Sequence, residues 1–495
     1  MVQDQHIRKP GFNERYYICR CTEGYSSNFS ITAKYSKPIT KELLSNALHS
    51  LIKKNSWLIQ NFFKIDNECG SVTNGKNYEV RILESVQFSD VVEFQEIDSF
   101  NEEIASEVNR RTFAMNTNLP LWRIIVFQQK SDEQLVCVYV DHSHYDGLAA
   151  VQFHKDLTRE LSSTAKDVQF IEDIFQYTRD FDYLPKTIIQ EAETVTDLFI
   201  PSYFQIIRHY LEKYLPSFLV KLTNWITRFV TPKSKSTPNL GIQPVFHTQK
   251  PTEKNLESKF KFLTFNPEQV AEITKFCRSQ GITLTSYFDV LFLKTLQETV
   301  FQAVDPNKQF STSSLVAING RRYYSEDIKN FRYGTMVCGD EIILPCLAKQ
   351  NITSSMVSFH KQMMDNIRSK ASFKAIGMYN YRNNWEYFKS RLGKIGGRFS
   401  LTISNLGKIE NSNTEYQLEK VYFLSNTGVV YNFILNMVTT PNNELTVVVG
   451  YLPEFDEYKL YDSKVMPIFF DQLEANLLQY WKPQKLPNCR LPLRR

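Results

Sequence analysis

The sequence has few of the features that mark secreted or membrane-spanning proteins. Its eight cysteines are dispersed, none belongs to a Cys-x-x-Cys pair, and only Cys19 and Cys21 lie close together. Scattered thiols favour a reduced, intracellular protein over a disulfide framework. The first ten residues are polar and contain no apolar core of a signal peptide. No segment offers about 20 uninterrupted apolar residues, so we expect no membrane-spanning helix.

The charge is also too small to indicate a nucleic-acid partner. The 495 residues carry a formal net charge of +5, and no nucleic-acid-binding motif is visible. We therefore expect no nucleic acid, whereas a phosphorylated cofactor or an anionic membrane surface would suit a mildly basic protein. With 42% hydrophobic and 14% aromatic residues, the chain is typical of a globular protein with two or more domains.

The most informative segment runs from Leu135 to Gly147. Its first half, Leu135-Val-Cys-Val-Tyr-Val140, is an apolar run rich in β-branched residues, which predicts a buried strand. His142 and Asp146 follow the end of this strand. Gly147 excludes a continuation of the strand, and residues 148–154 predict the start of a helix. An imidazole held by such rigid backbone can act as a base near neutral pH. His142 is therefore the predicted base, and a structural histidine is the alternative.

At these residues the chain resembles the acyl-CoA-dependent acyltransferases that share a His-x-x-x-Asp-Gly motif and a chloramphenicol acetyltransferase-like fold. The fungal alcohol O-acetyltransferase family is the most similar branch. Leu121-Trp-Arg-Ile-Ile-Val-Phe127 resembles its Trp-Arg-Leu strand, and Ser404-Asn-Leu-Gly407 resembles a turn of its second half. The Asp-Phe-Gly-Trp-Gly motif of the plant enzymes is absent. N-acetyltransferase relatives acting on sphingoid-base-like amines share these motifs.

The resemblance implies an α/β fold in which two condensation-domain-like mixed-sheet domains flank a central tunnel. Acetyl-CoA and the acceptor would enter this tunnel from opposite faces. His142 would take the proton from the acceptor as it attacks the thioester carbonyl, with no covalent acyl-enzyme and no metal. His144 is the competing base and a candidate tunnel residue.

Asp146 and Gly147 complete the predicted catalytic motif. The resemblance implies that Asp146 holds the loop through an arginine, and the sequence leaves Arg123, Arg321 and Arg322 open as its partner. An unpaired buried carboxylate would be costly. Gly147 would let the backbone approach the acyl group and donate an N–H to the oxyanion; a plain strand-to-helix turn is the alternative.

Further candidates come from the second half of the chain. Ser404 and Asn405 are expected to end the strand Phe399–Ile403 and to supply polar groups to the tunnel, although an Asn-containing turn explains them equally well. The candidate contacts to the acetyl-CoA phosphates are four basic residues, and solvated surface charges are the alternative. They are Arg321, Arg322, Lys394 and Arg398.

The domain division follows a change in composition. Residues 231–255 are rich in Pro and Lys and read as a linker between a domain at 1–230 and one at 256–495. We expect strands near 28–35, 121–128, 134–141, 258–265, 312–318, 400–404, 417–424, 429–438 and 444–451. We expect helices after Thr40 and Asn266 and near 101–112, 147–162, 285–299, 353–369 and 457–480. Thr40 and Asn266 are predicted caps.

Residues 203–229 combine bulky aromatic side chains with basic ones around Pro216. This pattern fits an interfacial segment on a membrane or lipid-droplet surface, and two core helices are the alternative. The protein is then expected in the cytoplasm or peripherally on the endoplasmic reticulum or lipid droplets, as a monomer. The predicted activity is acetyl transfer to an aliphatic alcohol. The alternatives are transfer to a long-chain amine, thioester hydrolysis and a catalytically silent acyl-binding protein.

Overall fold

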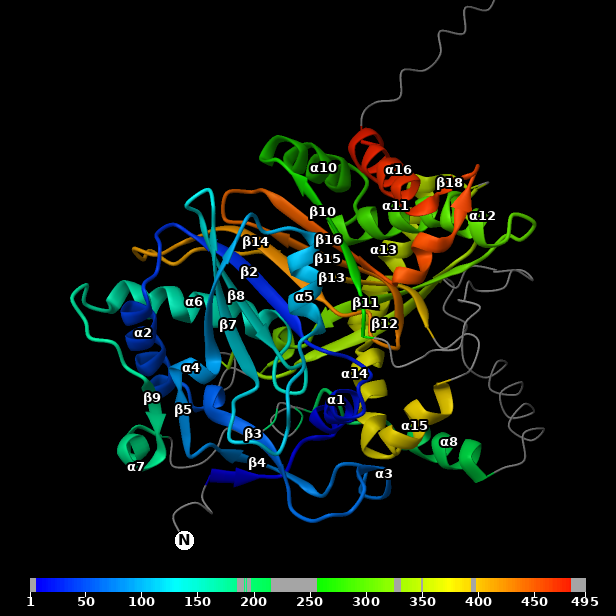
Figure 1. Cartoon of the computed structure of the whole chain (residues 1–495). Coiled ribbons are helices and arrows are strands. Elements are labelled where there is room, and N and C mark those ends of the chain that lie inside the picture. The colour runs from blue at the N-terminus through cyan, green and yellow to red at the C-terminus, as the bar shows by residue number, and fades with distance from the viewer. Residues whose placement is uncertain are drawn as a thin grey trace, which may run out of the picture.

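The computed structural model describes residues 6–184, 191, 193, 197–214, 256–324, 331–348, 350–392 and 398–481. The predicted linker at 231–255, the predicted phosphate contact Lys394 and residues 215–229 of the predicted interfacial segment lie outside these residues. Two mixed β-sheets, each associated with its own helices, form the frame of the molecule (Figure 1). This is the predicted α/β class with two mixed-sheet halves.

The first sheet has five strands in the order β14-β2-β8-β7-β6. Its neighbours are antiparallel except for the parallel pair β6 and β7. The strands are β2 (Phe29–Tyr35), β6 (Val92–Ile97), β7 (Trp122–Gln129), β8 (Gln134–Val140) and β14 (Leu418–Ser425). Helices α2 (Lys41–Lys54) and α6 (Gly147–Ser163) pack against each other beside this sheet (Figure 1).

The second sheet has six strands in the order β10-β16-β15-β13-β11-β12. The strands are β10 (Lys259–Phe265), β11 (Thr312–Asn319), β12 (Val337–Leu344), β13 (Phe399–Lys408), β15 (Tyr431–Thr439) and β16 (Leu445–Tyr451). Its main helices are α10 (Pro267–Ser279), α11 (Leu284–Glu298), α13 (Ile352–Ser369) and α16 (Val465–Gln479), and α11 packs on both α13 and α16. Each sheet and its helices enclose a large apolar cluster of their own.

The helices start where the sequence places cap residues. The Thr40 side chain accepts a hydrogen bond from Leu43 N, and Asn266 forms a capping box with Gln269 at the start of α10. Helix α5 (Glu102–Arg110) begins after Asn101, whose side chain accepts from two backbone N–H groups. A side-chain oxygen at this position satisfies N–H groups that have no partner within the helix. Local chemistry therefore fixes these boundaries.

The remaining elements are mostly short. One three-stranded sheet contains β1 (Ile7–Arg8), β4 (Tyr78–Ile82) and β3 (Gln60–Lys64), and the two-stranded pairs are β5 (Ser85–Gln87) with β9 (Asp173–Gln176) and β17 (Lys459–Leu460) with β18 (Ser463–Lys464). The helices are α1 (Phe12–Thr22), α3 (Gly70–Thr73), α4 (Phe88–Val91), α7 (Tyr177–Asp180), α8 (Tyr203–Tyr214), α12 (Val300–Val304), α14 (Ala371–Gly377) and α15 (Asn384–Arg391).

Two local expectations need correction. Strand β13 continues to Lys408, so Ser404 and Asn405 lie within a strand that pairs with β15 and not in a turn after it. The helix expected at 457–480 begins only at Val465, because a 3₁₀ turn at Pro453–Glu457 and the β17–β18 hairpin precede it. The sheets also do not divide strictly between the two halves of the chain. Strand β14 comes from the second half and pairs with β2 in the first sheet.

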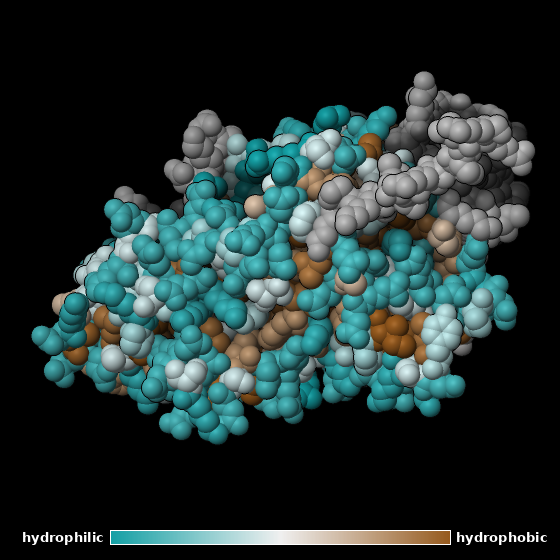
Figure 2. Space-filling model, turned by 90° about the horizontal axis from the view of Figure 1, so that it is seen from above, coloured by the Kyte–Doolittle hydropathy of each residue, from teal (hydrophilic) through white to brown (hydrophobic). Residues whose placement is uncertain are grey.

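The surface is mostly hydrophilic on the face shown in Figure 2, with hydrophobic residues scattered between polar ones. Within the described ranges, no helix is both long and apolar enough to cross a lipid bilayer. Among the same residues, no group of three His, Cys, Asp or Glu side chains is placed to hold a metal ion.

Candidate active site

The turn that carries the motif joins β8 to α6. Strand β8 ends at Val140, and Asp146 caps α6 by accepting a hydrogen bond from Ala149 N at 2.9 Å. The turn is held from the second half of the chain, because Thr335 Oγ1 donates to the carbonyl of His142 at 3.0 Å. The backbone of Tyr145 also pairs with Gly334 in an isolated parallel bridge. His142 is therefore positioned by both halves of the protein.

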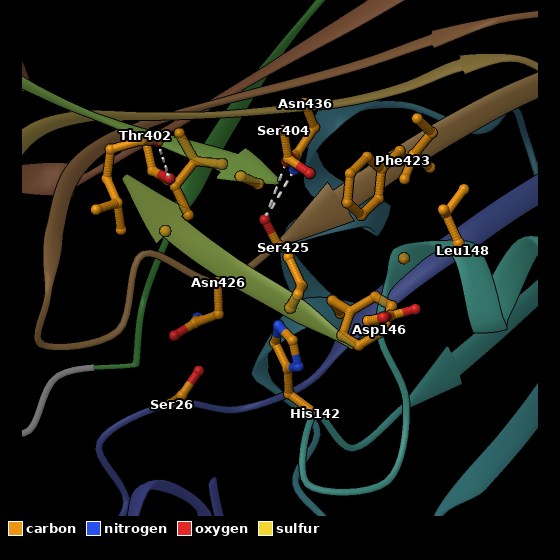
Figure 3. A pocket seen from close by; sticks show the side chains of 18 of the residues that line it. Ser26, His142, Asp146, Leu148, Thr402, Ser404, Phe423, Ser425, Asn426 and Asn436 are labelled. Atoms are coloured by element: carbon orange, nitrogen blue, oxygen red, sulfur yellow. Dashed lines mark hydrogen bonds between the residues drawn. The ribbon is translucent and has the colours of Figure 1, made fainter. Parts of the chain in front are cut away.

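His142 faces a cavity between the two sheets (Figure 3). The cavity has an empty volume of about 1040 Å³, the open space at its mouth included. Its walls come from α1, the start of α6, and strands β11, β12, β13, β14 and β15. Polar groups that line it include Ser26, Thr402, Ser404, Ser425, Asn426 and Asn436 (Figure 3).

The His142 ring is fixed by aromatic neighbours. It stacks on Tyr17 of α1 with a centroid distance of 4.1 Å and an interplanar angle of 12°, and Phe29 lies 5.0 Å away. Burial, and secondarily the positive charge of Arg20, lower the pKa of His142 to about 4. An imidazole with this pKa is neutral at pH 7, which is the form that can accept a proton.

Asp146 is the buried partner of Arg321. The Arg321 Nη1 atom lies 2.6 Å from Asp146 Oδ2, and both side chains are 5% exposed. Met336 N donates to the same oxygen at 2.8 Å, while Arg321 Nη2 donates to the carbonyl of Gly334. Of the three arginines left open by the sequence, the structure thus selects Arg321. The carboxylate holds the turn in place and is occupied by protein groups.

The other two arginines have different surroundings. Arg123 Nη1 donates to the carbonyls of Pro120 and Trp122, each at 2.6 Å. The side chain of Arg322 is exposed. Neither contacts Asp146.

His144 does not reach the cavity, which corrects the expectation that it lines the tunnel. Its ring is 1% exposed and stacks on Trp57 at a centroid distance of 4.1 Å. Trp57 Nε1 also donates to the carbonyl of His144 at 3.0 Å. The turn directs this residue into the core of the first half, where it fills space beside Trp57.

Gly147 lies close to the Leu406 side chain of β13. A Cβ atom at this position would lie 2.7 Å from Leu406 Cδ2 and 3.4 Å from Phe423 Cζ. All three residues line the cavity. A side chain at 147 would therefore force the end of the Leu406 side chain to shift at the cavity wall.

Ser404 and Asn405 both line the cavity from β13, but their side chains have different surroundings. The Asn405 amide donates to Thr285 Oγ1 at 3.3 Å and accepts from Gly407 N at 2.8 Å, which fixes the left-handed conformation at Gly407 (φ +74°). Ser404 lies beside Asn436 (Figure 3). Ser404 is thus the better candidate for a polar contact with a substrate.

Two of the four predicted phosphate contacts are occupied by protein groups. Arg321 is paired with Asp146, and Arg398 Nη1 donates to the backbone carbonyls of Gly428 at 2.7 Å and Tyr431 at 2.8 Å. Burial lowers the pKa of Arg398 to about 10. We therefore reassign these two arginines to structural roles. Arg322 is exposed and stays a candidate.

A second cavity adjoins the first on the side of α1, α14 and α15. It shares Tyr17, Arg20 and Tyr431 with the first cavity and has an empty volume of about 1200 Å³. Its other walls carry the aromatic side chains Tyr16, Tyr379, Tyr387, Phe388 and Phe399. No sequence pattern indicated Tyr17 or Arg20, because α1 lies more than 100 residues before the motif.

Comparisons with known proteins agree with this architecture. The family model described as alcohol acetyltransferase matches residues 9–473. N-acetyltransferase SLI1 of Saccharomyces cerevisiae is 23% identical over 88% of this chain and 94% of that protein. Alcohol O-acetyltransferase 2 of the same yeast is 21% identical over 93% of this chain and 94% of that protein.

Solved structures show the same fold at lower identity. The TRI3 trichothecene 15-O-acetyltransferase from Fusarium sporotrichioides has a TM-score of 0.62 at 13% identity, covering 95% of this chain and 94% of that one. The first condensation domain of the calcium-dependent antibiotic synthetase has a TM-score of 0.56 at 13% identity, covering 96% of this chain and 95% of that one.

Proposed function

Because this chain belongs to the alcohol acetyltransferase family, we propose that it transfers the acetyl group of acetyl-CoA to the hydroxyl of an aliphatic alcohol, with His142 as the general base. The observation that carries this proposal is the placement of His142: a neutral imidazole, fixed by stacking, faces a cavity that both halves of the chain line with polar groups. A positioned base contributes about 10² to 10⁴ in rate.

The reaction needs only one side chain, His142, to accept and return a proton. The acceptor oxygen attacks the thioester carbonyl carbon while its proton passes to His142. The carbon–sulfur bond then breaks, and the CoA thiolate leaves and takes the proton back from the imidazolium. Holding both substrates at one imidazole supplies much of the acceleration. Ser404 from β13 is proposed as a polar contact at the reacting centre, and Asp146 with Arg321 keeps the turn in position.

The lining of the first cavity supports an alcohol over a simple amine. Its one described acidic side chain, Asp146, is already neutralised by Arg321, and Arg20 adds a positive charge. An aliphatic amine has a pKa of about 10.4 and is mostly a cation at pH 7, so this cavity offers it no counter-charge. The similarity to N-acetyltransferase SLI1 makes an amine acceptor the second candidate.

A single set of assays separates these functions. Purified protein is mixed with acetyl-CoA and a panel of alcohols and amines, and both free thiol and product mass are measured, with His142→Ala as the control. Ester products that require His142 support the proposal. Amide products with inert alcohols would assign the N-acetyltransferase instead. Thiol release without an acylated product would indicate a hydrolase, and binding without turnover would indicate an acyl-binding protein.

We also propose peripheral contact with a membrane or lipid-droplet surface through residues 203–229. In the described part, helix α8 exposes large apolar side chains at Tyr203 (87% exposed), Phe204 (58%) and Ile207 (57%). Aromatic and aliphatic side chains on one amphipathic helix are typical of interfacial binding. Co-sedimentation with anionic lipid vesicles tests this, and no binding by the parent protein would refute it.

A further inference from the structure

Arg20 is a buried charge that the proposed reaction does not yet use. It lies in the last turn of α1 and is 5% exposed. Its Nε atom has no hydrogen-bond partner, and among the described residues no carboxylate forms an ion pair with it within 4.0 Å. A buried guanidinium is costly unless an anion and hydrogen-bond acceptors satisfy it. Arg20 therefore has unused capacity to bind an anion.

The neighbours of Arg20 in the fold are aromatic. Its guanidinium carbon lies 5.9 Å from the centroid of Tyr16 and 5.5 Å from that of Tyr17. Cation–π contacts of this kind stabilise the charge but leave the N–H donors unused. The stacking therefore orients the group without neutralising it.

The acidic groups near Arg20 are engaged elsewhere. Asp141 attracts Arg20 only from beyond ion-pair distance, and its own carboxylate accepts hydrogen bonds from the backbone N and the hydroxyl of Ser143. Asp146 is paired with Arg321, and Glu341 is an exposed residue of the second cavity. None of these carboxylates provides Arg20 with a direct partner.

Arg20 also has a specific position relative to the base. It lines both cavities, and it lies over the same Tyr17 ring that stacks on His142 at 4.1 Å. The guanidinium and the imidazole thus both contact the same aromatic ring. The phosphates of acetyl-CoA are separated from the thioester by the whole pantetheine arm, so they cannot lie at this distance while the thioester is at His142. An anion bound by Arg20 therefore belongs to the acceptor.

We propose that Arg20 binds a carboxylate of the acceptor, so that the preferred substrate is a hydroxyl compound that carries an acidic group close to its reacting hydroxyl. This inference rests on the proposed acetyl transfer. A guanidinium can donate two parallel hydrogen bonds to a carboxylate, which adds both affinity and orientation. Such a contact would direct the hydroxyl toward His142 and would exclude simple cationic amines.

Matched acceptors test this directly. Each hydroxy acid is compared with its methyl ester, which has the same chain and hydroxyl but no charge, and kcat/KM is measured for both. The wild-type protein is expected to prefer the acid by at least about tenfold, since hydrogen bonds between charged groups are stronger than those between neutral ones. Arg20→Gln should lower kcat/KM for the acid by about the same factor and leave the ester within about threefold.

The control variant is Arg382→Gln, which removes a positive charge from the second cavity only. Arg382 stacks on Tyr379 and Tyr387 at 4.1 and 3.8 Å and does not line the first cavity. In Arg382→Gln, the ratio of kcat/KM for the acid to kcat/KM for the ester should equal the wild-type ratio. Arg20→Lys keeps the charge without the planar fork and should retain part of the preference, which also covers the case in which Arg20→Gln does not fold.

Three results would overturn the proposal. The first is an equal wild-type kcat/KM for the acid and the ester. The second is an equal loss of kcat/KM for both acceptors in Arg20→Gln. The third is an effect of Arg20→Gln on the KM of acetyl-CoA alone, which would assign Arg20 to the donor phosphates. Equilibrium binding of an alkanoate without a hydroxyl separates this proposal from the proposed reaction. Weaker alkanoate binding by Arg20→Gln than by Arg382→Gln would support the carboxylate site even if no acetyl transfer were found.

Discussion

The pair formed by Asp146 and Arg321 gives the sharpest test of how the site is built. Replacing Arg321 with Met removes the cation and leaves the Asp146 carboxylate 5% exposed with no counter-charge. Breaking a buried ion pair in this way costs about 3–5 kcal/mol. Two backbone contacts from Arg321, to the carbonyls of Tyr333 and Gly334, are lost as well.

The expected loss is large enough to measure in a thermal unfolding scan. For a domain of ordinary size, each kcal/mol shifts the Tm by about 2–4 °C, so Arg321→Met should lower the Tm by at least about 6 °C. Activity should fall too, because the turn that holds His142 is tied to the segment at 333–336 through this pair. The matched control is Arg322→Met. Because the Arg322 side chain is exposed, this change should alter the free energy of unfolding by no more than about 0.5 kcal/mol.

The double variant Asp146→Asn with Arg321→Met separates charge from packing. It removes both charges while keeping an oxygen at position 146 that can accept from Ala149 N. Because no buried charge is left unpaired, this variant should be more stable than Arg321→Met alone by about 0.5–3 kcal/mol. An Arg321→Met protein that melts within about 1 °C of the wild type and of Arg322→Met would refute this account of the turn.

Four further outcomes are expected. His142→Ala should lower kcat by at least about a hundredfold with a near-normal melting curve, since a positioned base contributes about 10² to 10⁴; turnover close to wild type would discard His142 as the base. Because the pKa of His142 is lowered to about 4, kcat/KM for an alcohol should be flat from about pH 6 to 8 and fall only as the imidazole becomes protonated below about pH 5, whereas an amine acceptor should give a profile that climbs toward alkaline pH. Gly147→Ala should fold normally but lose about tenfold in kcat/KM through displacement of Leu406, and adding Leu406→Ala should restore it; no rescue would indicate a role for the Gly147 backbone. Replacing Phe204 and Ile207 of α8 with Ser should reduce vesicle binding without changing the Tm, whereas unfolding of this variant would assign the helix to the core.

Much of the local structure followed from short-range chemistry. The β-branched run before His142 formed β8, and the capping residues Thr40, Asn101 and Asn266 stand at the starts of α2, α5 and α10. The family and the fold class were also evident from the motif at His142 to Gly147 and its flanking elements. These features depend on neighbours within a few residues, so the linear sequence contains all the information they need.

The boundaries that failed depend on pairing between distant strands. Strand β13 continues through Ser404 and Asn405 because β15 lies beside it and satisfies its backbone groups. Strand β14 joins the first sheet because β2 offers it an edge, although almost 400 residues separate the two strands in the chain. Neither partner is visible in the local pattern of residues.

The sequence by itself predicted His142 as the base, and it determined the turn that carries His142 and the need for a cation beside Asp146. Only the tertiary structure decided which cation that is, because Arg321 reaches Asp146 across 175 positions of the chain and Arg123 and Arg322 do not. It also decided that His144 packs on Trp57 and that Tyr17 and Arg20 stand beside His142. Helix caps are set by local backbone hydrogen bonding, whereas the end of β13, the charge pairs and the cavity walls are set by which strands and surfaces the fold brings together.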